Sequence, residues 1–192
     1  MNPLGVMPVF MSMTSDLDRK QRRITAFKAL LTAFSTLIVF AFGGQMLFDF
    51  FGISVSGLKV VGGILFFIMG YDMLNARLSR MKIGEEDVKT YVEDISITPL
   101  GIPMIAGPGS ITNAIILMDQ SKQMNEKIIL ITAILAVCLI VLTILLSATK
   151  IMRILGETGN KVLMKLMGLI VMVIAVEFFF TGIEPYIKNI LN

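Results

Sequence analysis

Two clusters of helix-breaking residues interrupt a chain whose remaining sequence is apolar enough to lie in a lipid bilayer. The first cluster is Asn2-Pro3-Leu4-Gly5 with Pro8, and the second is Thr98-Pro99-Leu100-Gly101 with Pro103 and Gly107-Pro108-Gly109. Proline lacks a backbone N–H and clashes with the preceding turn, so each cluster is expected to unwind a helix. Unwound backbone inside a bilayer is tolerated only where protein buries it or where it lines a watery cavity. A matching pair of breaks in two halves of a chain therefore points to a transporter's substrate site.

Composition and segment length place the chain among integral membrane proteins. Hydrophobic residues make up 55% of the 192 residues and charged residues 16%, whereas a soluble domain carries about 25% charged residues. Segments 24–48, 56–74, 128–149 and 162–183 have the length of about 20 apolar residues that a membrane crossing needs, and so has 95–118 if its breaks interrupt one segment. A soluble helical bundle would need polar helix faces, which these segments lack. We therefore predict a single all-α polytopic membrane domain over residues 1–192.

The composition also argues against several classes of site. The single cysteine, Cys138, excludes an internal disulfide, and the absence of histidine removes the commonest zinc ligand and general base. A nucleotide-binding loop of the Gly-x-x-x-x-Gly-Lys type is absent, so ATP is not expected to drive this chain. The net charge of +3 reflects uneven loops rather than a nucleic-acid surface. No metal, cofactor or nucleic acid is expected.

Lys and Arg accumulate in cytoplasmic loops, and this rule predicts the orientation. The loops 14–23, 75–94 and 150–161 carry four, four and three of these residues, against Lys122, Lys127 and Lys188 on the opposite side. These three loops are therefore predicted to be cytoplasmic, with both chain ends on the other side of the membrane.

The two halves of the chain resemble each other around the breaks. We expect repeat 1 over residues 1–74, a solvated linker over 75–94 and repeat 2 over 95–192. Lys59 and Gly62 align with Lys165 and Gly168 in the third segment of each half. Three crossings in each half would invert the second copy, which gives a 3+3 inverted repeat of six segments with broken segments 1 and 4. Chance similarity between apolar segments is the alternative.

The first segment, residues 2–13, is too short to cross a membrane. As a helix it would span about 20 Å, against roughly 30 Å for the hydrocarbon core. Comparison with the second half predicts a preceding helix of about 15–20 residues, so segment 1 is expected to be truncated at its N-terminal side.

The unwound segments supply the predicted substrate-binding residues. A half-helix is expected to begin at Ser110 as its N-cap and another near Pro8, each directing its positive dipole end towards mid-membrane, where it would attract a carboxylate. Carbonyls freed at Pro3, Gly5, Pro99 and Gly101 would receive an ammonium group or a cation. The predicted set is Asn2, Pro3, Gly5, Pro99, Gly101, Gly107, Gly109, Ser110, Thr112 and Asn113. Kinks that only aid helix packing are the alternative.

Two carboxylates were considered for coupling to an ion. Glu177 lies deep in the last segment, where a charge costs about 2.5–3.5 kcal/mol, so it is expected to face the bundle interior. Its role would be proton coupling or ammonium binding, unless it is a neutral acid bonded to a neighbouring helix. Asp72 ends the third segment and is the second candidate, although an acid there is more often an interfacial residue.

The breaker motifs carry a family resemblance. The opening residues 2–10, the turn Phe51-Gly52-Ile53-Ser54, Gly62-Gly63 with Asp72-Met73-Leu74, and above all residues 99–112 are similar to the MarC (UPF0056) family. The resemblance covers essentially the whole chain and implies a multi-pass protein with six helices in a bacterial or archaeal inner (plasma) membrane. Some members, of the SnatA type, transport small neutral amino acids such as glycine and alanine. Members have apolar sequence before the Asn-Pro motif, and this chain does not.

The favoured interpretation is a secondary carrier for a small zwitterionic amino acid, coupled to H⁺ or Na⁺, and not an enzyme. Its expected partners are the lipid bilayer, the zwitterion, the coupling ion and further copies of the chain in a homo-oligomer. Export of drugs or other metabolites and a structural or lipid-binding role are the alternatives. Gly70-Tyr71-Asp72 is similar to part of an intramembrane aspartyl protease signature, but the partner Gly-x-Gly-Asp motif is absent.

Overall fold

All regular structure in the described part of the chain is helical. The computed structural model describes residue 1, residues 3–75 and residues 88–191. The elements are α1 (Pro3–Met13), α2 (Arg19–Phe51), α3 (Val55–Leu74), α4 (Val88–Ile95), the wide-turned helix η2 (Ser96–Ile105), α5 (Pro108–Gln120) and α6 (Met124–Leu191). The predicted all-α architecture is therefore confirmed.

The number of membrane-crossing helices is lower than the sequence predicted. Among the described residues, four helices are long and apolar enough to cross a membrane: α2, α3 and two parts of α6. A fifth crossing is obtained if Val88–Ile105 and Pro108–Gln120, which meet at a bend of 62°, form one broken span. Helix α1 has only 11 residues and extends about 16 Å, so it does not have the length of a sixth crossing.

Helix α6 bends at Gly156. This residue has a positive φ of 67° and a ψ of −178°, which no helical residue adopts. Glycine alone reaches such a conformation at little cost because it has no Cβ. The bend separates Met124–Ala148, here called proximal α6, from Thr158–Leu191, here called distal α6. A loop is predicted over 150–161, but most of these residues are helical in the structure.

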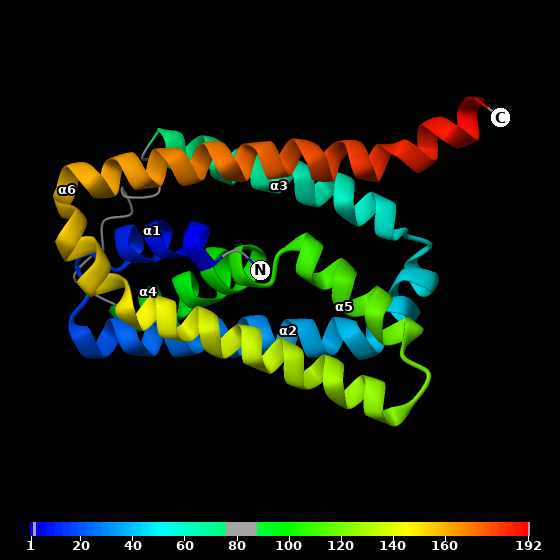
Figure 1. Ribbon diagram of the computed structural model, residues 1–192, viewed down its shortest axis with the longest axis horizontal. Helices are drawn as coiled ribbons and strands as arrows, with labels where there is room; N and C mark the ends of the chain where they lie inside the picture. Colours follow the sequence, from blue (N-terminus) through cyan, green and yellow to red (C-terminus); the bar gives the residue numbers. More distant parts are fainter. Residues whose placement is uncertain (2, 76–87, 192) are drawn as a thin grey trace.

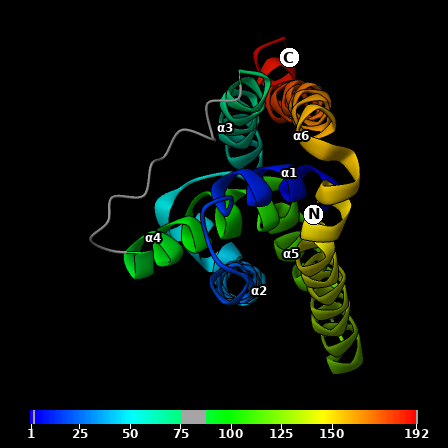
Figure 2. The same cartoon turned by 90° about the vertical axis from the view of Figure 1, so that its left-hand side faces the viewer.

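The long helices form two layers that enclose the broken segments (Figures 1 and 2). Helix α3 and distal α6 run side by side in opposite directions in one layer. Helix α2 and proximal α6 form the other layer, α1, η2 and α5 lie between the layers, and α4 lies beside α2 at one edge. Most of the second breaker cluster is buried or half-buried by these helices, while Thr98 stays exposed.

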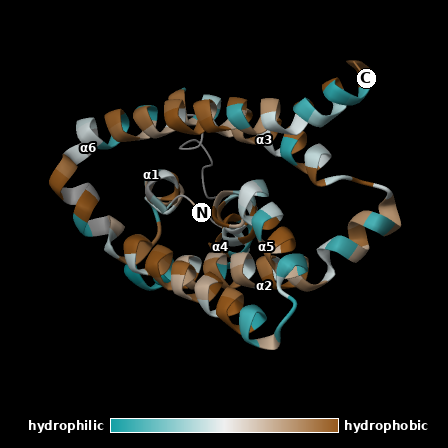
Figure 3. Ribbon diagram, turned by 45° about the vertical axis from the view of Figure 1, so that its right-hand side comes forward, coloured by the Kyte–Doolittle hydropathy of each residue, from teal (hydrophilic) through white to brown (hydrophobic). Residues whose placement is uncertain are grey.

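The connections at the two ends of the molecule differ in charge. The turn between α1 and α2, the start of α4 and the bend of α6 lie at the left end of Figure 1. The turn between α2 and α3, the turn between α5 and α6 and the C-terminal end of α6 lie at the right. The described parts of the three basic loops therefore share one end of the molecule. Hydrophilic residues gather near the turns, and apolar residues cover the long helices between them (Figure 3).

Local signals explain where α2 begins and ends. The Asp18 carboxylate accepts a bond from the Gln21 N–H at 2.7 Å, and the Gln21 side chain accepts one from the Asp18 N–H at 2.9 Å. This reciprocal capping box satisfies donors that the first helical turn leaves open. Gly52 ends the helix in the left-handed region with a φ of 63°, and the Ser54 side chain then caps α3 by accepting from the Gly57 N–H.

Arg22 holds the end of α1 against the start of α2. Its guanidinium donates from Nε to the Thr14 carbonyl at 2.8 Å and from an Nη to the Ser15 carbonyl at 2.7 Å. Replacing Arg22 with alanine removes both charge-assisted bonds, and we expect a loss of about 1.5–3 kcal/mol in the free energy of unfolding. The measurement is the thermal midpoint of unfolding in detergent, which should fall in Arg22→Ala. Arg22→Lys, the control, should recover only part of the lost stability. An unchanged midpoint in Arg22→Ala would contradict the anchoring role.

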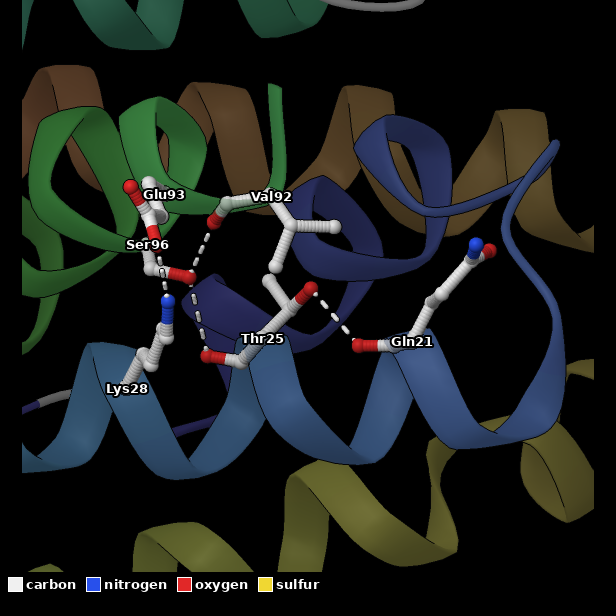
Figure 4. Close-up of polar contacts among 6 residues, drawn as sticks. All are labelled: Gln21, Thr25, Lys28, Val92, Glu93 and Ser96. Carbon is white, nitrogen blue, oxygen red and sulfur yellow. Dashed lines mark hydrogen bonds and ion pairs between the residues drawn. The ribbon is translucent and has the colours of Figure 1, made fainter. Parts of the chain in front are cut away.

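The start of the bent segment is tied to α2 by polar contacts (Figure 4). Lys28 Nζ and Glu93 Oε1 form an ion pair at 2.7 Å. The Ser96 hydroxyl lies within hydrogen-bond distance of the Val92 and Thr25 carbonyls. Glu93 lies in α4, within the predicted linker 75–94, and Ser96 begins η2, within the predicted repeat 2. Residues 88–94 of the predicted linker 75–94 form helix on the surface of α2, and residues 76–87 lie outside the described residues.

Candidate functional site

A cavity of about 270 Å³ lies where the two breaker clusters meet. The first cluster contributes Gly5, together with Met1 and Val6, and the second contributes Gly107, Gly109, Ser110 and Asn113, together with Met104. The remaining lining side chains are Phe66, Met69 and Met73 of α3 and Val171, Ile174 and Phe178 of distal α6. Residues about 100 positions apart in the sequence therefore share one cavity inside the helix layers.

Glycines bring the backbone of the second cluster close to the surrounding helices. A Cβ on Gly107 would lie 2.7 Å from the tip of the Phe66 ring, and a Cβ on Gly109 would overlap the Phe178 ring. The two rings stand edge to face with centroids 6.3 Å apart. On the same side, Gly62 of α3 leaves room for the Pro108 ring. These contacts fix the start of α5 against both helices of the α3 layer.

Helix α5 begins beside the cavity with unpaired donors. Gly107 is its N-cap and Pro108 its first residue, and Gly107 provides no side-chain cap. The Ile111 N–H is bonded to the Gly107 carbonyl at 2.9 Å. Since Pro108 has no N–H, the Gly109 and Ser110 N–H groups are the ones that the first turn leaves for a ligand. The prediction that Ser110 is the N-cap is wrong, because proline at the first position starts the helix three residues earlier.

Helix η2 leaves backbone carbonyl oxygens as acceptors just before the start of α5. Thr98 and Ile102 have non-helical dihedral angles, and the Ala106 N–H reaches back five residues to the Gly101 carbonyl at 2.9 Å. In a continuous helix the residue at position 108 would donate its N–H to the Pro103 carbonyl, five residues back, or to the Met104 carbonyl, four residues back. Pro108 has no N–H and donates to neither. The Pro103 and Met104 carbonyls are therefore available to a ligand. The Pro103 oxygen lies next to Gly107, a lining residue.

Helix α1 also directs its N-terminal end towards the cavity. Gly5 and Val6 are buried and line the cavity, whereas the end of α1 at Met13 lies at the far left of the molecule (Figure 1). Pro8 lies inside the helix without breaking it. The prediction that a half-helix begins near Pro8 is therefore wrong. Helix α1 begins at Pro3 because proline at the first helical position lacks only an N–H that would have no partner within the helix.

The structure places half of the predicted substrate-binding residues around the cavity. Gly5, Gly107, Gly109, Ser110 and Asn113 line it. Pro3, Pro99, Gly101 and Thr112 do not belong to its lining. Asn2 lies outside the described residues.

The predicted residues that do not line the cavity have packing positions. A Cβ on Gly101 would lie 2.7 Å from the Ser96 carbonyl and 2.9 Å from Thr32, so Gly101 allows η2 to pack closely on α2. Thr112 is 1% exposed, and its hydroxyl has no hydrogen-bond partner among the described residues.

Neither predicted coupling carboxylate reaches the cavity. Glu177 is exposed on distal α6, so the prediction that it faces the bundle interior is wrong in this structure. Its neighbour Phe178 is the residue that turns inwards and lines the cavity. Asp72 is half-buried and does not belong to the lining, whereas its neighbour Met73 does. Adjacent residues of a helix point in different directions, so the cost of burying a charge at Glu177 did not identify the inward-facing position.

Sequence reasoning missed the apolar walls of the cavity. Phe66, Met69 and Met73 lie on one face of α3, and Val171, Ile174 and Phe178 on one face of distal α6, each set spaced by three, four or seven residues. This spacing is the only signal in the sequence, and it is hidden because the lipid-facing positions of both helices are equally apolar.

Comparison with known proteins agrees with the breaker motifs. A family model for MarC family integral membrane proteins matches residues 1–187. A UPF0056 membrane protein of Pyrococcus horikoshii is 42% identical over 183 residues, covering 95% of this chain and 88% of the relative. The UPF0056 membrane protein YhcE of Escherichia coli is 32% identical over 193 residues, covering 100% of this chain and 90% of the relative. No solved structure gives a significant match. The chain therefore belongs to the MarC family of multi-pass integral membrane proteins, which has relatives in both bacteria and archaea.

Proposed function

We propose that the chain is a secondary carrier for a small neutral amino acid of the glycine and alanine class, driven by an H⁺ or Na⁺ gradient across the inner membrane. The observation that carries the proposal is the shared cavity: both breaker clusters line one space of about 270 Å³ between the helix layers. Matching breaks in the two halves of a carrier are where substrate sites are found. In this proposal the substrate leaves chemically unchanged, so the protein is not an enzyme.

The helix ends supply the groups that recognise a carboxylate. The Gly109 and Ser110 N–H groups at the start of α5 lie beside the cavity, and Ser110 and Asn113 add a hydroxyl and an amide to its lining. The positive end of the α5 dipole favours an anion at this point. Because α1 also begins at the cavity, two helix N-termini converge on it, which strengthens the preference for negative charge.

The carbonyls freed in η2 supply the groups that recognise an ammonium. Pro108 cannot donate to the Pro103 or Met104 carbonyl, so these carbonyls keep acceptor capacity at or next to the lining residues Met104 and Gly107. Donors for a carboxylate and acceptors for an ammonium separated by a short distance are the requirements of an α-amino acid zwitterion. A simple anion or a simple cation would use only one of the two.

The size and walls of the cavity favour a small, uncharged side chain. Pockets for drug-sized ligands usually have volumes of about 300–1,000 Å³, and this cavity lies below that range. The described lining contains no charged side chain, and its walls include Phe66, Met73 and Phe178. Glycine and alanine satisfy both limits, and a charged amino acid would leave its side chain unpaired in an apolar environment.

The arrangement of helices supports the proposed 3+3 inverted repeat with alternating access. Helices α1 and α5 leave the cavity in opposite directions, towards the left and right ends of the molecule in Figure 1. The repeat would relate α1, α2 and α3 to α5, proximal α6 and distal α6. Each half also packs on the broken segment of the other, since α2 contacts η2 and α5 while α6 contacts α1. Rocking of one half against the other would then expose the cavity to each side in turn.

Uptake into proteoliposomes tests the proposal. Radiolabelled glycine and alanine should accumulate in vesicles that contain the protein, and an imposed H⁺ or Na⁺ gradient should raise the initial rate above that of vesicles without a gradient. Unlabelled alanine should compete, and glutamate and lysine should not. Protein-free vesicles are the control. Absence of counterflow with every small neutral amino acid, from protein that is shown to be folded, would overturn the proposal.

Replacing Glu177 with glutamine is expected to leave the pH dependence of this uptake unchanged. The Glu177 carboxyl is exposed and does not line the cavity, so its protonation does not alter the charge seen by the substrate. The measurement is the initial rate against pH for wild type and Glu177→Gln, with Lys165→Gln as a control for changing another exposed charge on the same helix. A lost or displaced pH profile in Glu177→Gln would instead support the coupling role that the sequence suggested.

A further inference from the structure

A second cavity, of about 430 Å³, lies at the end of the molecule where the basic connections gather. Its polar lining consists of Arg19, Arg22, Arg23 and Lys150, and its apolar lining of Phe10, Leu145, Leu146 and Ile154. It is formed by α1, the start of α2, the end of proximal α6 and the segment before Gly156. None of its residues belongs to the proposed substrate site.

The cations of this cavity have few protein partners. The ion pairs among the described residues are Lys28–Glu93 and Lys188–Glu184, so Arg19, Arg23 and Lys150 have no carboxylate within ion-pair distance in that part of the chain. Arg22 is partly engaged by the Thr14 and Ser15 carbonyls and has a structural role. Three cations that converge on one cavity repel one another unless an anion is present.

Part of the apolar lining lies on the outer surface of the protein, whereas Phe10 and Leu145 are buried. Leu146 is 41% exposed and Ile154 is 85% exposed. A soluble anion would gain nothing from these side chains, whereas a lipid would place its acyl chains along them and its phosphate among the cations. Basic pockets between membrane helices on the cytoplasmic side are typical of sites for anionic lipid headgroups.

We propose that this cavity binds the headgroup of an anionic phospholipid from the cytoplasmic leaflet. The arginines would contact the phosphate oxygens, since a guanidinium presents paired donors that match phosphate geometry. Lys150 would face the phosphate from the opposite wall. The excess of positive charge selects against zwitterionic lipids, because their headgroups would bring a further cation into the cavity. The bound lipid would also bridge α2 and α6, which belong to different halves of the chain.

Lipid titration of the detergent-purified chain, followed by native mass spectrometry, tests this site. The probes are short-chain phosphatidylglycerol, phosphatidylcholine of the same chain length, and inorganic phosphate. We expect phosphatidylglycerol to bind at least tenfold more tightly than phosphatidylcholine, with no binding of phosphate at the same concentration. Each cation near a membrane surface contributes about a fivefold change in affinity, so Arg23→Gln with Lys150→Gln should weaken phosphatidylglycerol binding about 25-fold.

The matched control removes the same charge from the opposite end. Lys122→Gln with Lys127→Gln should leave the phosphatidylglycerol affinity within about twofold of wild type, because a distant charge acts only through the screened field. Should the double variant not fold, Arg23→Gln and Lys150→Gln are measured separately, each with an expected fivefold loss. Equal affinities for the two lipids, or an affinity unchanged in the pocket variants, would overturn the proposal. Phosphate binding as tight as that of the lipid would also overturn it, in favour of a soluble anion.

Discussion

Replacing Gly70 with leucine is expected to separate α3 from distal α6 and to lower the free energy of unfolding by about 3 kcal/mol or more. A Cβ on Gly70 would lie 2.7 Å from the Gly168 carbonyl and 3.0 Å from the Met172 N–H. These are backbone atoms, which cannot move aside as a flexible side chain can. Overpacking of a close contact costs about 1–3 kcal/mol, and more where the backbone itself must shift.

Close backbone approach occurs from both helices, so a larger residue at either glycine would separate them. A Cβ on Gly168 would lie 2.8 Å from the Gly70 carbonyl, and one on Gly63 would lie 2.7 Å from the Ala175 carbonyl. Helices in a bilayer associate through such close packing of small residues, because lipid tails are as apolar as the side chains and provide no hydrophobic drive. A leucine at Gly70 therefore removes the main contribution to the pairing of these two helices.

The measurement uses the buried thiol of the chain. Cys138 is 0% exposed, so a thiol-reactive fluorogenic dye reports its exposure on heating. Gly70→Leu should lower the midpoint of this transition strongly. Gly43→Leu is the matched control, since a Cβ on Gly43 meets nothing within 4 Å and leucine is a better helix former. Equal midpoints for the two variants would contradict the packing argument.

Removing the two polar side chains of the proposed substrate site should abolish measurable uptake. Ser110 and Asn113 are the polar side chains of α5 that line the cavity. A hydrogen bond to a charged group contributes about 1.5–3 kcal/mol, which corresponds to roughly 10- to 100-fold in uptake efficiency for each side chain. Ser110→Ala with Asn113→Leu is therefore expected to lower the ratio kcat/KM by at least about a hundredfold while the thermal midpoint stays near that of wild type.

Thr112→Val separates this site from a general effect on α5. Thr112 lies between the two lining residues in the sequence, but it is buried outside the cavity and its hydroxyl has no partner among the described residues. Valine has nearly the same shape, and removing an unsatisfied hydroxyl costs little or is stabilising. Uptake by Thr112→Val should stay within about twofold of wild type. A loss as large as that of the double variant would place the substrate on the other side of α5.

The membrane class, the helical architecture and the break in the second cluster follow from local chemistry, and the sequence predicted them. Long apolar runs favour a bilayer whatever packs around them, and proline lacks an N–H in every context. Each predicted segment overlaps described helix, but only four helices, or five with the bent pair, have the length of a crossing, and caps such as Asp18 and Gly107 moved some helix ends. Five of the predicted substrate-binding residues lie around the cavity, because the breaker clusters from which they were predicted line it.

Only the tertiary structure decided which side chains face that cavity and which face lipid. In water, apolar residues mark the inner face of a helix. In a bilayer an apolar side chain is favourable on either face, so the sequence does not distinguish Leu65, which is 45% exposed, from the half-buried Phe66 that lines the cavity. The outward position of Glu177 and the inward position of Phe178 could not be distinguished without the packing of α3 on distal α6. That packing is set by backbone approach at glycines far apart in the chain, a relation that no local pattern contains.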